Sequence, residues 1–154
     1  MTAYRIDRID LPAAELVDEV TRADLVFYGV DHSGVSYEGQ VYIDASDAEP
    51  PTTRDPSRGY AGSFTVFGHA GCYGDDGHCL PGQGFRDEFD RRPRHPLTPF
   101  TRTVVVTDRV RSAMSSGATQ ISVTVVASVP PPEGGEEPGE PMRIESVRLL
   151  TYHG

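Results

Sequence analysis

The chain has 154 residues, a net charge of −9 and no lysine, so all 14 of its cationic side chains are arginines. That length suits one domain, and a hydrophobic fraction of 37% with 16 glycines and 13 prolines favours a loop-rich β-protein over a helical bundle. The acidic balance, without any basic stripe, argues against nucleic acids and anionic membrane surfaces as partners.

The N-terminal segment lacks the apolar core of a secretory signal. No apolar run approaches the roughly 20 residues that span a bilayer. The sequence as written therefore predicts a soluble, cytoplasmic protein. In a reducing compartment, two cysteines are more often thiols or metal ligands than a disulfide.

Residues 1–22 are expected to form an N-terminal extension ahead of a domain at 23–154. Within the extension, Pro12 suits a first helical position, and apolar residues recur at helical spacing up to Val20. This pattern predicts a short helix at 12–20.

The next segments are typical of β-structure. Residues 25–30 form a continuous apolar run, and residues 35–43 alternate between apolar and polar side chains. The two segments flank Asp31-His32-Ser33-Gly34, a short turn that contains glycine. Together they predict a β-hairpin.

Later strands are expected at 60–67, 101–106, 119–129 and 142–152, the last with a bulge at 146–148. A short helix should follow the second of these, capped by Thr107 or Asp108 and ending at Met114. The spacing lacks βαβ units, which favours antiparallel pairing. The expected fold class is therefore all-β: a single antiparallel sandwich, or flattened barrel, of about six or seven strands with long loops and one or two short helices.

Four segments, taken in order, resemble the C-terminal β-sandwich domain of tyrosinases and polyphenol oxidases, the type-3 copper oxidases. They are LVFYGVDHSGVSYEGQVYID at 25–44, YAGSF at 60–64 followed by His69, HPLTPFTRTVVVTDRV at 95–110, and the pair TQISVTVVASVP and MRIESVRLLTYH, which resembles a closing hairpin. The resemblance covers about residues 23–153.

In that family the domain follows a helical catalytic domain and packs over its dicopper site. The resemblance therefore implies a non-catalytic accessory domain that covers and stabilises a type-3 copper oxidase domain, in cis or in trans, with the copper held by that partner. The histidine count agrees, because a type-3 centre needs six histidines and this chain has five, with no H-x-x-x-H pair on a predicted helix. We expect no enzymatic activity from the chain alone.

The family also implies that a side chain of this domain can occupy the entrance of the partner's copper site. The candidates are aromatic residues in or beside the long segment 68–99: Tyr73, Phe85, Phe89 and Phe100. Core packing is the commoner fate of phenylalanines in loops.

The segment GHAGCYGDDGHC at 68–79 is richer in cysteine and histidine than plant versions of the domain. His69, Cys72, His78 and Cys79 offer the imidazoles and thiolates that suit Cu(I) or Zn(II). This favours an alternative function, a small copper-handling β-sandwich protein. Against it, His78 and Cys79 are adjacent, which makes simultaneous ligation awkward. A Cys72–Cys79 disulfide and two free thiols are the other interpretations of this loop.

Overall fold

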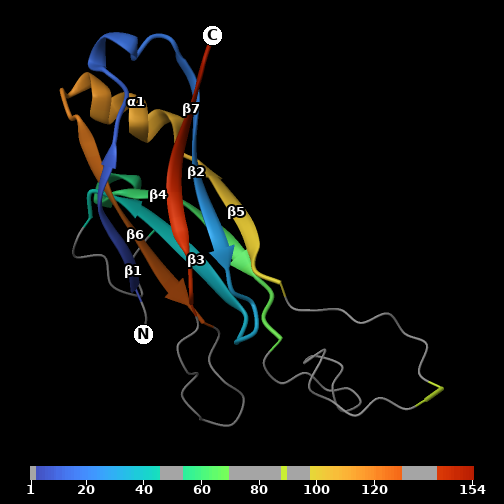
Figure 1. Cartoon of the computed structure of the whole chain (residues 1–154). Coiled ribbons are helices and arrows are strands. Elements are labelled where there is room, and N and C mark those ends of the chain that lie inside the picture. The colour runs from blue at the N-terminus through green and yellow to red at the C-terminus, as the bar shows by residue number, and fades with distance from the viewer. Residues whose placement is uncertain (1–2, 46–53, 70–87, 90–97, 130–141) are drawn as a thin grey trace.

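Seven strands form two antiparallel sheets in the computed structural model of the chain, which describes residues 3–45, 54–69, 88–89, 98–129 and 142–154 (Figure 1). One sheet has the strand order β1-β6-β3-β4 and the other β5-β2-β7. The strands are β1 (Ala3–Asp10), β2 (Val20–Val30), β3 (Tyr37–Ile43), β4 (Tyr60–Val66), β5 (Phe100–Val105), β6 (Gln120–Ser128) and β7 (Ser146–His153). The all-β sandwich expected from the sequence is confirmed.

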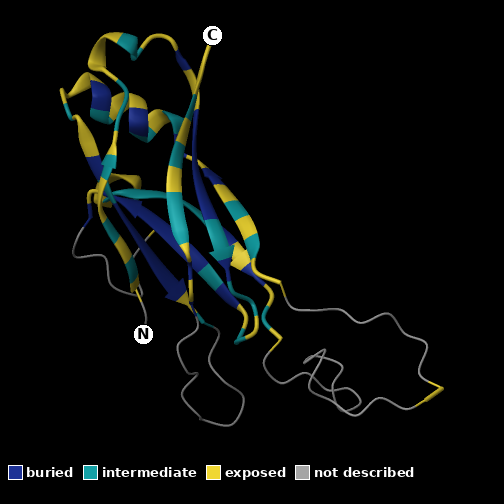
Figure 2. Ribbon diagram, viewed as in Figure 1, coloured by how far each residue is buried: buried dark blue, intermediate teal, exposed yellow. Residues whose placement is uncertain are grey.

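The core lies between the two sheets and is built by the alternation of side chains along the strands. On β2, the residues that face inward are Ala23, Leu25 and Phe27, and all three are fully buried. The facing sheet contributes the alternate apolar positions of β6, which are Ile121, Val123, Val125 and Ala127. Figure 2 shows the buried residues running along the middle of both sheets. Because one face of each strand is buried this way, its register is strongly specified.

The single α-helix of the described ranges, α1 (Thr107–Ser115), lies across one end of the sandwich and buries Val110 and Met114 in the core (Figure 1). Its predicted N-cap is wrong. The N-cap position is Val106, and no side chain caps the helix. The Thr107 hydroxyl instead accepts a hydrogen bond of 3.0 Å from the backbone N–H of Ala23, which attaches the helix to β2.

The predicted hairpin at 25–43 is wrong, because β2 and β3 belong to different sheets. The connection at 31–36 crosses from one layer to the other, and β3 pairs with β4 and β6 instead. The last two strands do not form the expected closing hairpin either, since β6 lies in the four-stranded sheet and β7 pairs with β2. Alternation reveals which side chains of a strand are buried, but it does not identify the neighbouring strand.

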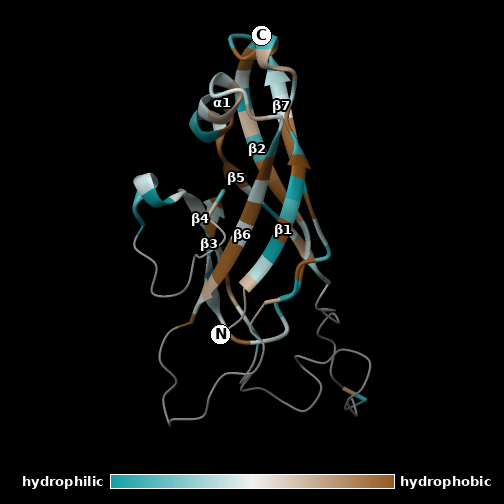
Figure 3. Ribbon diagram, turned by 90° about the vertical axis from the view of Figure 1, so that its left-hand side faces the viewer, coloured by the Kyte–Doolittle hydropathy of each residue, from teal (hydrophilic) through white to brown (hydrophobic). Residues whose placement is uncertain are grey.

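The helix predicted at 12–20 is also wrong. A single 3₁₀ turn, η1 (Ala14–Leu16), occupies that segment, and Val20 already begins β2. The first 22 residues therefore supply β1 and the start of β2 to the two sheets. Among the described strands, β1 pairs only with β6, and its side chains are mostly polar, as its largely teal ribbon in Figure 3 shows. Charged side chains on an edge strand discourage pairing with other chains.

The bulge expected at 146–148 is absent, because Ser146, Val147 and Arg148 pair in regular succession with β2. The irregularity in that pairing lies at the other end of the strand, between Val20 and Arg22. Within the described ranges, no helix is long and apolar enough to cross a membrane.

Candidate functional site: the histidine end of the sandwich

The end of the sandwich opposite α1 brings together two segments that are far apart in the sequence. The chain leaving β4 runs against the β2–β3 connection, where the backbone N–H of Gly68 donates to Ser36 Oγ at 3.0 Å. The backbone N–H of His69 donates to the carbonyl of His32, also at 3.0 Å. A Cβ at Gly68 would lie 2.1 Å from the Gly34 carbonyl oxygen, so this close approach requires glycine.

This backbone contact places the rings of His32 and His69 side by side. Their centroids are 4.9 Å apart, and the ring planes are nearly perpendicular, at 86°. Nδ1 of His69 lies 3.2 Å from the His32 carbonyl oxygen, and Nε2 of His32 lies 3.0 Å from the Thr98 carbonyl oxygen. Two histidines are therefore each anchored to the backbone at one nitrogen.

Phe100 and Arg102 continue the stack away from His69. The Phe100 ring lies 4.8 Å from the His32 ring, edge to face, and the guanidinium carbon of Arg102 lies 3.8 Å from the Phe100 centroid. Arg102 also donates from Nε to the Thr65 carbonyl oxygen at 3.1 Å. Phe100, one of the candidates for entering a partner's copper site, is thus half-buried in contacts within its own domain.

Asp31 supplies negative charge beside the histidines. Its carboxylate accepts hydrogen bonds from the backbone N–H of Ser33 at 2.9 Å and from the Ser33 hydroxyl at 3.0 Å. The backbone bond is the main reason that the pKa of Asp31 lies below its usual value, and partial burial opposes that shift. Burial is the main reason that the pKa of the nearby Tyr37 is raised to about 12, and the Asp31 charge adds to that shift.

The sequence-predicted site is only partly within the described residues. Cys72, Tyr73, His78, Cys79 and Phe85 lie outside them, and so do the disulfide and metal-site interpretations that depend on the cysteines. His69 is exposed, and Phe89 is 81% exposed. Among the described residues, no cluster of three or more histidine, cysteine, aspartate or glutamate side chains is arranged to hold a metal ion.

Sequence reasoning missed His32 as a partner of His69. The signal available was positional, because each histidine follows shortly after the end of a strand. β2 and β4 flank β3 in the chain and run in the same direction, so both end at the same end of the sandwich (Figure 1). Recognising this requires knowing that β2 and β4 lie in facing sheets.

A second surface stands out on the outer face of the β5-β2-β7 sheet. Directly paired residues share a face, so Val105, Asp24 and Leu150 form one row, with Arg22 and Tyr152 in the next. Val105, Leu150 and Tyr152 are three of the five large hydrophobic side chains exposed in the described ranges. This outer face therefore carries exposed apolar side chains, and no described residue covers them.

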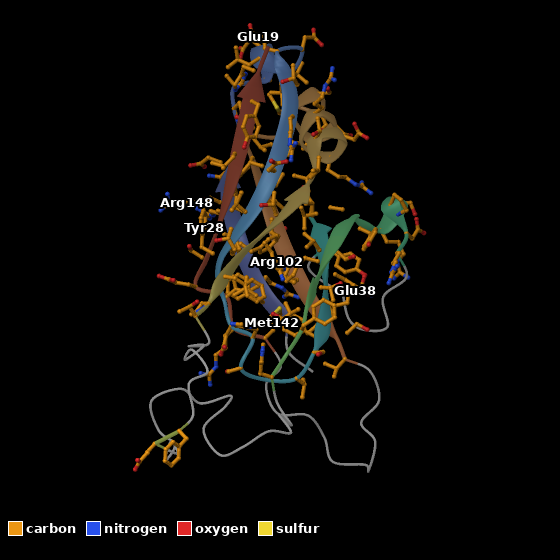
Figure 4. The ribbon with its side chains drawn as sticks, turned by 90° about the vertical axis from the view of Figure 1, so that its right-hand side faces the viewer. Glu19, Tyr28, Glu38, Arg102, Met142 and Arg148 are labelled. Atoms are coloured by element: carbon orange, nitrogen blue, oxygen red, sulfur yellow. The ribbon has the colours of Figure 1, made fainter. Side chains whose placement is uncertain are left out.

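Two arginines, Arg22 and Arg148, lie beside tyrosines on this outer face. The Arg22 Nε donates to both Asp24 carboxylate oxygens, at 2.8 and 3.0 Å, and its guanidinium carbon lies 6.0 Å from the Tyr152 centroid. The Arg148 guanidinium lies 5.8 Å from the Tyr28 ring, and Figure 4 shows these two side chains together on the sheet. Aromatic residues and arginine are the types enriched in protein interfaces.

An open cleft lies between α1 and the 3₁₀ turn η2 (Pro56–Arg58), with a volume of about 390 Å³. Arg109 lines it, and its guanidinium donates to the backbone carbonyls of Pro56 and Tyr60. These contacts join α1 to the chain that enters β4. Arg109 therefore has a structural role, because it holds α1 against this segment.

The comparisons with known proteins found a similar fold but no matching sequence. No family model matches the sequence, and no curated protein matches it. Solved structures of latent aurone synthase, a polyphenol oxidase, share the fold: the recombinantly expressed enzyme and the enzyme from its natural source both superpose with a TM-score of 0.54, at 15% and 14% identity. Each alignment covers 98% of this chain and 24% of the other. The chain thus has the fold of a polyphenol oxidase segment and spans about a quarter of those chains.

Proposed function

We propose that this protein is a non-catalytic accessory domain that packs on the dicopper catalytic domain of a tyrosinase-like phenol oxidase, covers its active site and stabilises it. The observation that carries the proposal is the coverage: almost the whole chain aligns with a quarter of a larger polyphenol oxidase chain that is described as latent. A segment of that size corresponds to one domain of the larger protein. The copper chemistry would belong to the partner, in cis or in trans.

The apolar outer face of the β5-β2-β7 sheet is the surface best suited to that contact. It offers Val105, Leu150 and Tyr152 together with two arginines stacked on tyrosines. A stable interface usually buries about 800 Å² on each partner, with aromatic and arginine side chains at its centre. Phe89, at 81% exposure, and Phe67, at 74%, are further exposed aromatic side chains outside the sheet. Docking by this face would exclude substrate sterically.

The test is to mix the protein with a cognate type-3 copper catalytic domain and measure the oxidation of a catechol. We expect a lower rate that depends on the concentration of the added protein, together with a complex on gel filtration. Separate elution of the two proteins at micromolar concentration, with an unchanged rate, would contradict the proposal.

The alternative function is copper handling by His69, Cys72, His78 and Cys79. The observation that favours it is that His69 is exposed and lies beside a second histidine. A competition titration with Cu(I) against a chromogenic chelator tests whether these residues bind copper. Binding that is no tighter than in a Cys72→Ser/Cys79→Ser variant would exclude the cysteines as ligands.

A further inference from the structure

We propose that His32 and His69 form a binding site for one divalent transition-metal ion, with Zn²⁺ and Cu²⁺ as the ions that imidazole ligands suit. The proposal rests on these two described residues and their contacts. It is independent of the accessory role proposed above and does not require either cysteine.

The hydrogen bonds determine which ring nitrogens are available. A carbonyl oxygen can only accept a hydrogen bond, so a ring nitrogen that bonds to one must carry the proton. This assigns the N–H to Nε2 in His32, bonded to Thr98, and to Nδ1 in His69, bonded to His32. The lone pairs therefore lie on His32 Nδ1 and His69 Nε2. Within the described ranges, neither of these two nitrogens has a hydrogen-bond partner.

The anchoring matches the way metal-binding histidines are held. Such a histidine almost always donates its other ring N–H to a carboxylate, a carbonyl or a water, and this fixes the ring orientation. Here both histidines donate to backbone carbonyls, at 3.0 and 3.2 Å. Phe100 also packs against the His32 ring, with the two centroids 4.8 Å apart.

The separation of the rings fits a shared ion. A metal–nitrogen bond of about 2.0–2.1 Å places the ring centre about 3.2 Å from the ion, so two imidazoles at a tetrahedral angle have centroids about 5 Å apart. The observed separation is 4.9 Å. The two rings are thus close enough for one ion to reach a nitrogen of each.

The surrounding charges and exposure suit an open site. Asp31 provides a carboxylate close enough to His32 for their charges to interact, while Arg102 lies beyond the Phe100 ring. His69 is exposed, so an ion and its water ligands can enter from solvent. In the described part of the chain no third protein ligand completes the set. We therefore expect water molecules in the remaining coordination positions.

The experiment uses the full chain with the substitutions Cys72→Ser and Cys79→Ser, so that no thiol contributes. ZnCl₂ and CuSO₄ are titrated in separate calorimetric runs at pH 7.5. In this background we expect His32→Gln and His69→Gln each to weaken binding by at least about tenfold, since losing even a residue that positions a ligand costs about 10–100-fold. His153→Gln is the matched control, because that histidine is exposed near the C-terminus at the opposite end of the molecule (Figure 1) and should leave the affinity unchanged.

A second measurement needs no substitution of either histidine. Long-range ¹H–¹⁵N spectra of the imidazoles should show Zn²⁺ shifting Nδ1 of His32 and Nε2 of His69, and leaving His153 unaffected. This result also decides the matter if His32→Gln fails to fold. Absence of Zn²⁺ and Cu²⁺ binding, equal affinity in the His32→Gln variant, or shifts confined to other histidines would overturn the proposal and leave the pair as a packing contact.

Discussion

The ring of Phe64 lies directly against the backbone of Gly39, its paired residue across β3 and β4. A Cβ at Gly39 would come within 2.6 Å of Phe64 Cζ. The ring occupies this space and extends from the four-stranded sheet to Phe27 on the facing sheet, with centroids 5.0 Å apart. Because Gly39 has no side chain, the ring of Phe64 fits against β3 and connects the two sheets.

Gly39→Ala should therefore destabilise the fold by about 2–3 kcal/mol, because the added methyl displaces a packed ring. Urea unfolding followed by circular dichroism measures the change. The control is Gly34→Ala, where a Cβ meets no atom within 4 Å, and there we expect a change within about 0.5 kcal/mol. Equal effects of the two substitutions would show that the Phe64 contact does not depend on the glycine.

Tyr37 should control part of the alkaline stability. Its hydroxyl is buried without a hydrogen-bond partner in the described ranges, and its pKa is raised to about 12, against about 10 for a tyrosine in an unfolded chain. Below pH 10 the hydroxyl is protonated in both the folded and the unfolded chain, so the raised pKa does not change the stability there. Between about pH 10 and 12 the unfolded chain loses this proton while the folded chain keeps it, so stability falls with rising pH.

Tyr37→Phe should remove that part of the alkaline loss and raise the stability at pH 7 by about 1 kcal/mol, since an unpaired hydroxyl leaves the core. Thermal unfolding at several pH values between 7 and 12 measures both effects. A decrease in stability at pH 7 would mean that the hydroxyl does have a stabilising partner.

The ion pair on the outer sheet face should respond asymmetrically to substitution. The Asp24 side chain is 5% exposed and the Arg22 side chain is 55% exposed. Arg22→Met leaves a buried carboxylate unpaired and should cost about 1–3 kcal/mol. Asp24→Asn leaves only an exposed guanidinium and should cost less. Denaturant midpoints of the two variants give the order, and a larger loss for Asp24→Asn would contradict it.

The proposed docking face predicts which substitutions disturb the complex with a copper oxidase domain. Val105→Glu and Leu150→Glu place a charge on the apolar outer face of the β5-β2-β7 sheet, where both side chains are exposed. Each should weaken association by at least about tenfold, since a desolvated unpaired charge costs more than 1.4 kcal/mol. Surface plasmon resonance measures the affinity.

The control for that experiment is Ser115→Glu, an exposed position on α1 outside the sheet face. It introduces the same charge and should leave the affinity unchanged. If all three variants bind like the wild type while the complex still forms, the contact lies elsewhere on the domain.

The candidate site shows where prediction from sequence stops. His69 was identified because cysteines and another histidine follow it closely in the chain. His32 was not connected with it, because the contact depends on a hydrogen bond between segments 37 residues apart. Phe100 was one of four candidates for entering a partner's copper site, and it packs between His32 and Arg102.

The sequence by itself determined six of the seven described strands, β2 to β7, and the position of α1, because burial imposes a period of two on strands and 3.6 on helices. It also carried the resemblance to the polyphenol oxidase β-sandwich that the structural likeness supports at the level of the fold. Only the tertiary structure decided that β2 and β3 lie in opposite sheets and that β6 and β7 do not pair. Strand pairing depends on long-range hydrogen bonds between backbones, and backbone groups are the same in every residue. The contact between His32 and His69 also depends on the tertiary structure, because it forms where the chain crosses from one sheet to the other.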